Sequence, residues 1–266
     1  MMLTALLLLI SLSVSGTENP AFEQSHSTWS ALLSRHVHWN AEGTTSTVDY
    51  AGFSRDSKAL DAYLHTLSTI DRATFDAWNQ DDRQAFLINA YNAATVQLIL
   101  TRYPKLESIK DLGGLFSSPW KKEFVDLLGE RRSLDSIEHG LLRGARDYRD
   151  PRIHFAVNCA SIGCPALRPE AYVGEQLNAQ LEDQTQRFLK DRSRNRLAAD
   201  GESLQVSKLF DWYAEDFDAH SGGVANFLAD HAEALALDTA HARQLRERAL
   251  PIRFSDYNWS LNEKPH

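Results

Sequence analysis

The stretch from 81 to 104, DDRQAFLINAYNAATVQLILTRYP, constrains the fold more than any other part of the sequence. Asp81 and Asp82 suit the positive N-terminal end of a helix, and Pro104 marks its end. Between residues 85 and 100 the helix is apolar on nearly every face. Because such a helix has no face that prefers water, we expect it at the buried centre of a domain.

Two amides interrupt this apolar helix. Asn89 and Asn92 are spaced so that they lie one turn apart on the same face. A buried side-chain amide left without a partner costs about 1–3 kcal/mol, so each of them requires specific hydrogen bonds. Two roles remain open: the amides fix neighbouring loops, or they line a site.

The rest of the chain predicts further helices and a few short strands. Helical spacing of apolar residues recurs at 28–40, 56–70 and 173–191, and a hairpin with its bend near Gly129 is expected at 118–134. Ser133 can cap the helix that follows this hairpin. The apolar run IHFAV, 153–157, predicts a strand. No alternation of strands and helices and no internal linker is visible, so we expect one helix-rich α+β domain with a small sheet.

The N-terminus, MMLTALLLLISLSVSG, has the apolar run and the small residues of a secretory signal peptide. It is short for a membrane-spanning helix, and the polar stretch TENPAFEQSHS after it disfavours a buried helix. We therefore expect a signal peptide at 1–16, a tether at 17–27 and a single domain at 28–266. The mature protein would then be periplasmic or secreted, without a membrane span.

Charge and motifs narrow the function classes. The net charge of −8 argues against nucleic acid as a partner, because phosphate binding requires a basic surface. No HExxH, CxxC or GxSxG motif is present, and His36 and His38 are spaced poorly for a shared metal. We expect no metal and no cofactor, and an unidentified small molecule or peptide as the partner.

Both cysteines of the chain lie in HFAVNCASIGCPAL, 154–167. Three interpretations compete. In an oxidising compartment, Cys159 and Cys164 would form a disulfide across a short loop, which would stabilise the fold by roughly 2 kcal/mol. Alternatively one cysteine is a nucleophile, or the pair cycles between dithiol and disulfide.

The nucleophile hypothesis requires a base close to the thiol. His154 precedes Cys159 by five residues, and His139 lies on the preceding helix. Asn89, Asn92 or Asp256 could orient a histidine, as the third group does in a Cys-His-Asn or Cys-His-Asp arrangement. The candidate catalytic residues are therefore Cys159, His154, His139 and Asn92.

Five motifs can now be taken together. They are FLINAYNA (86–93), IEHGLLR (137–143), HFAVNCASIGCPAL (154–167), FDWYAEDF (210–217) and DYNWSLN (256–262). In this order and spacing the chain, from about Trp29 to Asn262, resembles the domain-of-unknown-function 547 family. The familiar form of the closing motif has Asp where this sequence has Asn258. The resemblance implies no settled activity, although bacterial members are often expected to be exported.

The resemblance indicates where to look for a site. Besides the catalytic candidates, its motifs contain the candidate binding residues Asn89, Tyr91, Glu138, Asn158, Ser161, Tyr257, Trp259 and Asn262. We expect these residues to converge on a pocket at the end of the 153–157 strand. A buried helix beside a small sheet is loosely similar to papain and transglutaminase folds. Two functions follow: a cysteine-dependent hydrolase or transferase acting on an amide or thioester, or a non-enzymatic periplasmic binding module with a Cys159–Cys164 disulfide.

Overall fold

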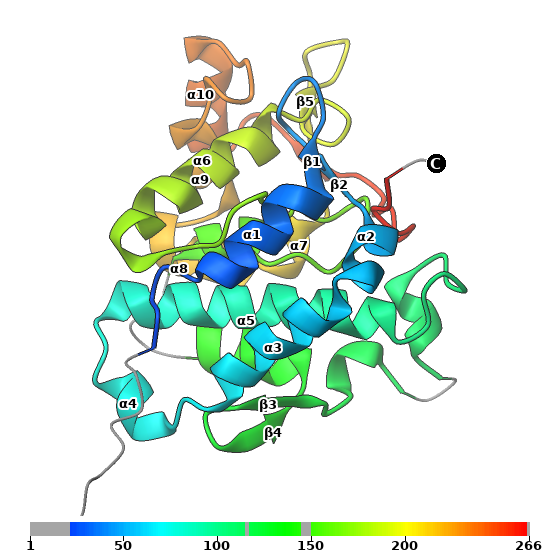
Figure 1. Cartoon of the computed structure of the whole chain (residues 1–266). Coiled ribbons are helices and arrows are strands. Elements are labelled where there is room, and N and C mark those ends of the chain that lie inside the picture. Colours follow the sequence, from blue (N-terminus) through cyan, green and yellow to red (C-terminus); the bar gives the residue numbers. More distant parts are fainter. Residues whose placement is uncertain (1–21, 115–116, 145–149, 265–266) are drawn as a thin grey trace, which may run out of the picture.

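The structure, a computed structural model, describes residues 22–114, 117–144 and 150–264 (Figure 1). These residues form many helices and several small sheets, which confirms the prediction of a helix-rich α+β fold. The expected signal peptide and the first part of the expected tether lie outside the described residues.

The α-helices are α1 (Ser27–His36), α2 (Tyr50–Arg55), α3 (Ser57–Ser68), α4 (Arg72–Asp76), α5 (Gln80–Leu100), α6 (Leu177–Lys190), α7 (Leu209–Trp212), α8 (Ala214–Ser221), α9 (Val224–Asp230) and α10 (Thr239–Arg246). Short 3-10 helices are η1 (Ile109–Leu112), η2 (Pro119–Lys121), η4 (Pro151–Phe155) and η5 (Gly174–Gln176), and η3 (Ser136–Leu142) is a π-helix. The strands are β1 (Val37–Trp39), β2 (Ser46–Val48), β3 (Val125–Leu127), β4 (Glu130–Arg132), β5 (Arg196–Leu197), β6 (Leu204–Val206) and β7 (Ile252–Phe254).

Helix α5 crosses the middle of the molecule (Figure 1). Most of its residues are buried. It begins after Asn79, whose side-chain oxygen accepts a hydrogen bond from the backbone N–H of Asp82 at 2.9 Å. Helices α2 and α3 and the short helices η3 and η5 pack against it. This confirms the central helix that the apolar faces predict, although the helix ends at Leu100, before Pro104.

The described residues form two hydrophobic clusters. The first surrounds α5 and includes Trp29 from α1 and Phe53 from α2. The second gathers buried side chains of α6 to α10, among them Phe188, Phe210 and Phe217. Helix α6 packs against η4, which lies between the two clusters. Side chains of η4 contribute to both clusters.

Three small sheets are found among the described residues. Strands β1 and β2 pair antiparallel with Val37 opposite Val48, and β3 and β4 form the expected hairpin. Its bend falls at Leu128 and Gly129, which both have positive φ, of 55° and 77°. Strand β5 pairs antiparallel with β6, and β6 pairs in parallel with β7.

The segment predicted as a strand at 153–157 is not a strand. Its first half belongs to η4, a 3-10 helix, because Pro151 occupies the first helical turn and the Asp150 carboxylate accepts from the Arg152 N–H at 2.9 Å. Ile153 and Phe155 are both buried, in different clusters. A short run that is apolar throughout fits a buried strand or a buried helical turn equally well, which explains the wrong prediction.

The end of the expected tether is part of the folded structure. Phe22 stacks on Trp78 at 5.4 Å between ring centroids, and His26 is buried beside Tyr63. Among the described residues, no helix combines the length and the apolar character that crossing a bilayer requires.

Candidate functional site

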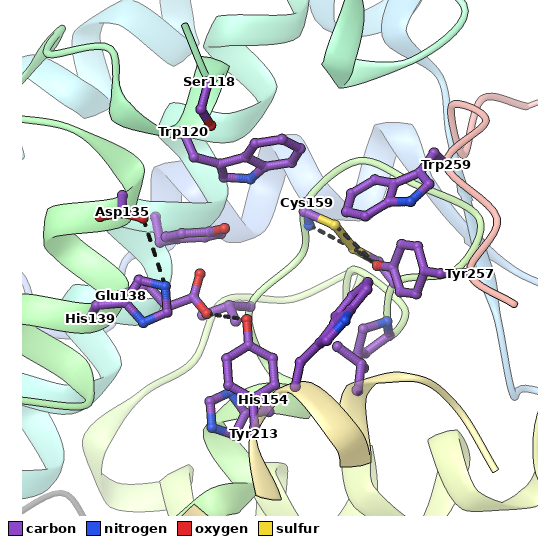
Figure 2. Close-up of a pocket in the computed structure, with 16 residues that line it drawn as sticks. Ser118, Trp120, Asp135, Glu138, His139, His154, Cys159, Tyr213, Tyr257 and Trp259 are labelled. Atoms are coloured by element: carbon purple, nitrogen blue, oxygen red, sulfur yellow. Dashed lines mark hydrogen bonds and ion pairs between the residues drawn. A yellow bond between two sulfur atoms is a disulfide. The ribbon is translucent and has the colours of Figure 1, made fainter. Parts of the chain in front are cut away.

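A cavity of about 270 Å³ lies between the Cys159–Cys164 loop, η3, η2, α7 and the C-terminal segment (Figure 2). Its lining consists of Tyr91, Ser118, Trp120, Asp135, Glu138, His139, His154, Val157, Cys159, Cys164, Pro165, Leu209, Trp212, Tyr213, Tyr257 and Trp259. Aromatic rings and a few polar groups dominate this set. Binding sites for small molecules generally have this composition.

Cys159 and Cys164 are joined by a disulfide, with 6.1 Å between their Cα atoms. The bonded pair forms part of the cavity wall. The Tyr257 hydroxyl donates to Cys164 Sγ at 3.0 Å and lies 3.2 Å from Cys159 Sγ. In this state neither sulfur is a thiolate, which is the form that a nucleophilic mechanism requires.

The segment after β7 is fastened over the disulfide loop by backbone hydrogen bonds. The N–H of Ile162 donates to the Ser260 carbonyl and the N–H of Gly163 donates to the Asn258 carbonyl, both at 2.8 Å. A Cβ on Gly163 would lie 2.9 Å from the Tyr257 ring, so only glycine allows the ring this close to the loop. This contact places Tyr257 and Trp259 in the cavity wall.

The aromatic wall is continuous around one side of the cavity (Figure 2). Trp259 lies 4.5 Å from Tyr257, 5.6 Å from Trp120 and 5.8 Å from Trp212, between ring centroids. Trp212 remains 43% exposed, so the wall reaches the surface. A flat apolar group or a cation can therefore contact several ring faces at once.

Glu138 supplies a carboxylate on the opposite side. It lies on η3, and the turn that leads into η3 is capped by Ser133, whose side chain accepts from the Ser136 N–H at 3.1 Å. The Tyr213 hydroxyl donates to Glu138 Oε1 at 2.6 Å. Burial, and then the charge of Glu138, raises the pKa of both Tyr91 and Tyr213, which keeps the two phenols protonated and able to donate.

A hydrogen-bonded network lies beneath Tyr213. The His154 ring stacks on Tyr213 at 3.7 Å, and its Nε2 is 2.6 Å from Asp216 Oδ2. Arg143 donates to the same carboxylate at 2.7 Å and to His139 Nδ1 at 2.7 Å. Although burial alone would raise it, the hydrogen bonds from His154 and Arg143 hold the pKa of Asp216 well below its usual range. Burial lowers the pKa of His154, so this imidazole is neutral near pH 7.

The cavity brings together part of the predicted site. Of the catalytic candidates, Cys159, His154 and His139 line it, and Asn92 does not. Of the binding candidates, Tyr91, Glu138, Tyr257 and Trp259 line it. In the described part of the chain, the two sulfurs contact the hydroxyls of Tyr257 and Ser161 and the backbone N–H of Cys159. No histidine nitrogen is among these contacts.

The remaining candidates are asparagines and Ser161, which lie behind the cavity wall. Asn89 donates to the Tyr172 carbonyl at 2.7 Å and accepts from the Tyr172 N–H at 3.0 Å. Asn92 binds the Ala156 carbonyl and the Asn158 N–H in the same two-sided way. These contacts are of the loop-fixing kind, the first of the two roles open for these amides.

The loop itself is held by its own asparagine. Asn158 donates to the Pro165 carbonyl at 2.7 Å and accepts from the Ala160 N–H at 2.9 Å. Asn262 donates to Asn158 at 3.4 Å and accepts from the Tyr50 hydroxyl at 2.7 Å. Ser161 and Asn262 line a second cavity on the other side of the disulfide loop.

Several important residues were not selected from the sequence. Trp212, Tyr213 and Asp216 all belong to the motif FDWYAEDF, so that motif contained a usable signal. Trp120 and Asp135 belong to segments between the motifs. Only the folded chain places these two residues in the same cavity wall as Glu138.

Comparison with known proteins gives one family. Residues 75–189 match the family described as Protein of unknown function, DUF547. This range contains α5, η3 and the disulfide loop. Neither the curated proteins nor the solved structures contain a match to the chain. The similarity to papain and transglutaminase folds stays a prediction, and it loses the support of a strand carrying His154.

Proposed function

The chain belongs to the DUF547 family through residues 75–189, and from this premise we propose that it is a binding protein that holds a small ligand in the aromatic cavity. The Cys159–Cys164 disulfide fixes one wall of that cavity. A disulfide persists in oxidising compartments, which agrees with export to the periplasm or the medium.

The bonded state of the two cysteines is the observation that carries this proposal. The disulfide lies in the cavity wall, and a thiol in the same place would be the nucleophile of the competing hypothesis. The loop around it is held at both ends by Asn158, which fastens the backbone at Pro165 and Ala160. A preorganised wall reduces the ordering cost of binding.

The size of the cavity supports a small ligand. Its volume of about 270 Å³ lies just below the range of roughly 300–1,000 Å³ typical of ligand pockets. The walls are rigid aromatic rings that contact one another, for example Tyr257 and Trp259. A small molecule or one side chain of a peptide fits these dimensions.

A second candidate is favoured by one specific observation. His154 is hydrogen-bonded to Asp216 and lines the same cavity as Cys159. After reduction, this pair could serve a cysteine-dependent hydrolase or transferase that acts on an amide or thioester. The first proposal and this one therefore differ in the redox state in which the protein works.

Thiol labelling of the exported protein distinguishes the binding protein with a disulfide from the thiol enzyme. We expect no alkylation before reduction and two alkylated cysteines after it, read as intact mass. Rapid labelling before reduction, together with turnover of an amide or thioester that is lost in Cys159→Ser, would overturn the binding proposal in favour of the thiol enzyme.

Binding itself can be followed through the indole N–H signals of the six tryptophans. Single Trp→Phe variants assign the signals. A ligand in the cavity should shift the signals of Trp120, Trp212 and Trp259, which line it. Trp29 belongs to the hydrophobic cluster around α5 and Trp78 packs against it, so their signals serve as internal controls. If a library of small molecules and peptides shifts the controls but never the cavity signals, the proposed binding site is wrong.

A further inference from the structure

We propose that the ligand of this cavity is a small organic cation that carries an ammonium group. The inference rests on the proposed binding function and deepens it. It follows from three features of the same cavity: the charges in its lining, a buried carboxylate without a cationic partner, and the faces of its aromatic rings.

The permanent charges in the lining are negative. Asp135 and Glu138 contribute carboxylates, and among the lining residues that the structure describes there is no lysine or arginine. The lining histidines are His139, whose Nε2 lies 3.8 Å from Asp135 Oδ1, and His154, which is neutral near pH 7. Arg143, which lies behind the wall, already donates to Asp216 at 2.7 Å and 3.1 Å. An anionic ligand would therefore enter without a positive partner, whereas a cation would meet two carboxylates.

Glu138 is the more informative of the two carboxylates, because it is only 6% exposed. Its oxygen accepts from the Tyr213 hydroxyl, and its charge acts on Arg143, but Arg143 pairs with Asp216 and no ion pair connects Glu138 to a basic residue in the described part of the chain. Buried charges are normally paired, since an unpaired one loses its hydration without compensation. A cation in the cavity would supply the missing partner.

The field of Glu138 extends across the cavity. Burial is the largest cause of the raised pKa of Tyr91 and of Tyr213, and the negative charge of Glu138 is the second largest. Burial is again the main cause of the raised pKa of Tyr257 on the opposite wall, where the charge of Arg194 lowers the pKa and the charge of Glu138 adds a smaller increase. The three phenols therefore stay uncharged and present their ring faces to the cavity.

The rings are of the kind that binds cations. Trp120, Trp212 and Trp259 line the cavity, with Trp259 on the side opposite Glu138 (Figure 2), and indole is the strongest cation–π partner among the side chains. Lys110 Nζ lies 3.8 Å from the centroid of Trp259, although Lys110 is not part of the cavity lining. An ammonium group in the cavity can make the same type of contact while Glu138 balances its charge.

A matched pair of probes separates charge from shape. Choline and 3,3-dimethylbutan-1-ol have nearly the same shape, but only choline carries a positive charge. Both are titrated into the wild-type protein at constant ionic strength, and the indole signals of Trp120, Trp212 and Trp259 are followed. We expect choline to bind at least about tenfold more tightly than the neutral alcohol.

The variant Glu138→Gln tests the carboxylate and keeps the hydrogen-bond acceptor for Tyr213. It should weaken choline binding by about tenfold or more and leave the neutral alcohol nearly unchanged. Glu233→Gln, at an exposed glutamate outside the cavity, removes the same charge from the molecule and should change neither affinity. The wild-type comparison stands even if Glu138→Gln fails to fold.

The outcomes distinguish this inference from the function on which it rests. If the neutral alcohol shifts the cavity signals at the same concentrations as choline, the cavity binds ligands but the cation preference is wrong. If choline leaves all three signals unchanged, the ammonium inference is again wrong, and the binding function is decided by the wider library. Equal losses in Glu138→Gln and Glu233→Gln would also contradict the assigned role of Glu138.

Discussion

The buried polar side chains of this chain differ in whether their polar atoms have hydrogen-bond partners. Asn89, Asn92 and Asn158 each bind a carbonyl and an N–H of a neighbouring loop, so their amides are satisfied on both sides. His26 is different: it is buried beside Tyr63, and its Nε2 has no partner in the described structure. The free energy of unfolding should therefore depend on pH through His26, and it should fall when one of the hydrogen-bonded asparagines is replaced.

Burial lowers the pKa of His26 from 6.5 to about 4, against a smaller opposing effect of Glu23. Between these two pH values the unfolded chain binds a proton that the folded chain does not, so stability falls as the pH drops. The loss in the free energy of unfolding should reach about 3 kcal/mol by pH 4, because a tenfold change in a protonation equilibrium corresponds to about 1.4 kcal/mol. Urea unfolding of wild type and His26→Gln at pH 7 and pH 4 measures it.

His154 also has a lowered pKa and is present in both proteins, so the difference between wild type and His26→Gln isolates the contribution of His26. We expect the variant to lose less stability than the wild type on acidification. Identical pH dependence in the two proteins would contradict a neutral, buried His26.

Asn92→Ala should remove both bonds that hold the start of the disulfide loop. The Ala156 carbonyl and the Asn158 N–H would lose their partner, and a buried group left unpaired costs about 1–3 kcal/mol. We expect a loss of about 2 kcal/mol or more in the free energy of unfolding, measured in urea.

Gln97→Ala is the matched control for Asn92→Ala. Gln97 is on the same helix, and its amide donates to Asp61 in an exposed contact. Its replacement should change stability by about 0.5 kcal/mol or less. A similar small effect of Asn92→Ala would show that the loop does not depend on this amide.

At the scale of an element, the loop from Cys159 to Cys164 is held from three directions. The disulfide closes it, the segment 258–262 hydrogen-bonds along it, and Arg194 donates to the carbonyls of Gly163 and Cys164 at 2.9 Å and 2.8 Å. The loop separates the aromatic cavity from the second cavity lined by Ser161 and Asn262. Its rigidity therefore determines the shape of the proposed binding site.

Replacing both cysteines by alanine should lower the free energy of unfolding by about 2 kcal/mol, because the disulfide closes only a short loop. The measurement is urea unfolding with and without reductant. Reductant should destabilise the wild type by a similar amount and leave the double variant unchanged. If reductant affects both proteins equally, the stabilisation does not come from the Cys159–Cys164 bond.

At the scale of the whole molecule, η4 connects the two hydrophobic clusters. Ile153 belongs to the cluster around α5, and Phe155 belongs to the cluster of α6 to α10. His154, between them, lies against the candidate site. The clusters are thus joined through the segment that leads into the disulfide loop, and we expect them to unfold together.

Phe155→Ala should cost about 3–5 kcal/mol, since the ring is fully buried among four phenylalanines. Hydrogen exchange should show reduced protection in both α5 and α9. Phe254→Ala, at a ring that is 40% exposed, serves as the control and should change stability little. Loss of protection in α9 alone would show that the clusters unfold independently.

The sequence by itself determined the elements whose local pattern allows one solution. An apolar helix with an acidic first turn had to be buried, and α5 is. The bend at Leu128 and Gly129 and the cap at Ser133 followed from turn and cap chemistry. The family motifs also placed Tyr91, Glu138, Tyr257 and Trp259 in one set, and these residues line one cavity.

Tertiary structure decided the rest, because contacts between distant segments depend on packing. A run that is apolar on all sides does not show its period, so the 3-10 helix at residues 151–155 results from Pro151 and the Asp150 cap together with burial between the two clusters. Trp120 lies outside the motifs and Trp212 lies within one of them, but their meeting with Trp259 requires η2, α7 and the C-terminal segment to converge. The charge of the cavity likewise exists only in the folded chain, where Glu138 lines the same cavity as these rings and the nearby Arg143 is engaged by Asp216.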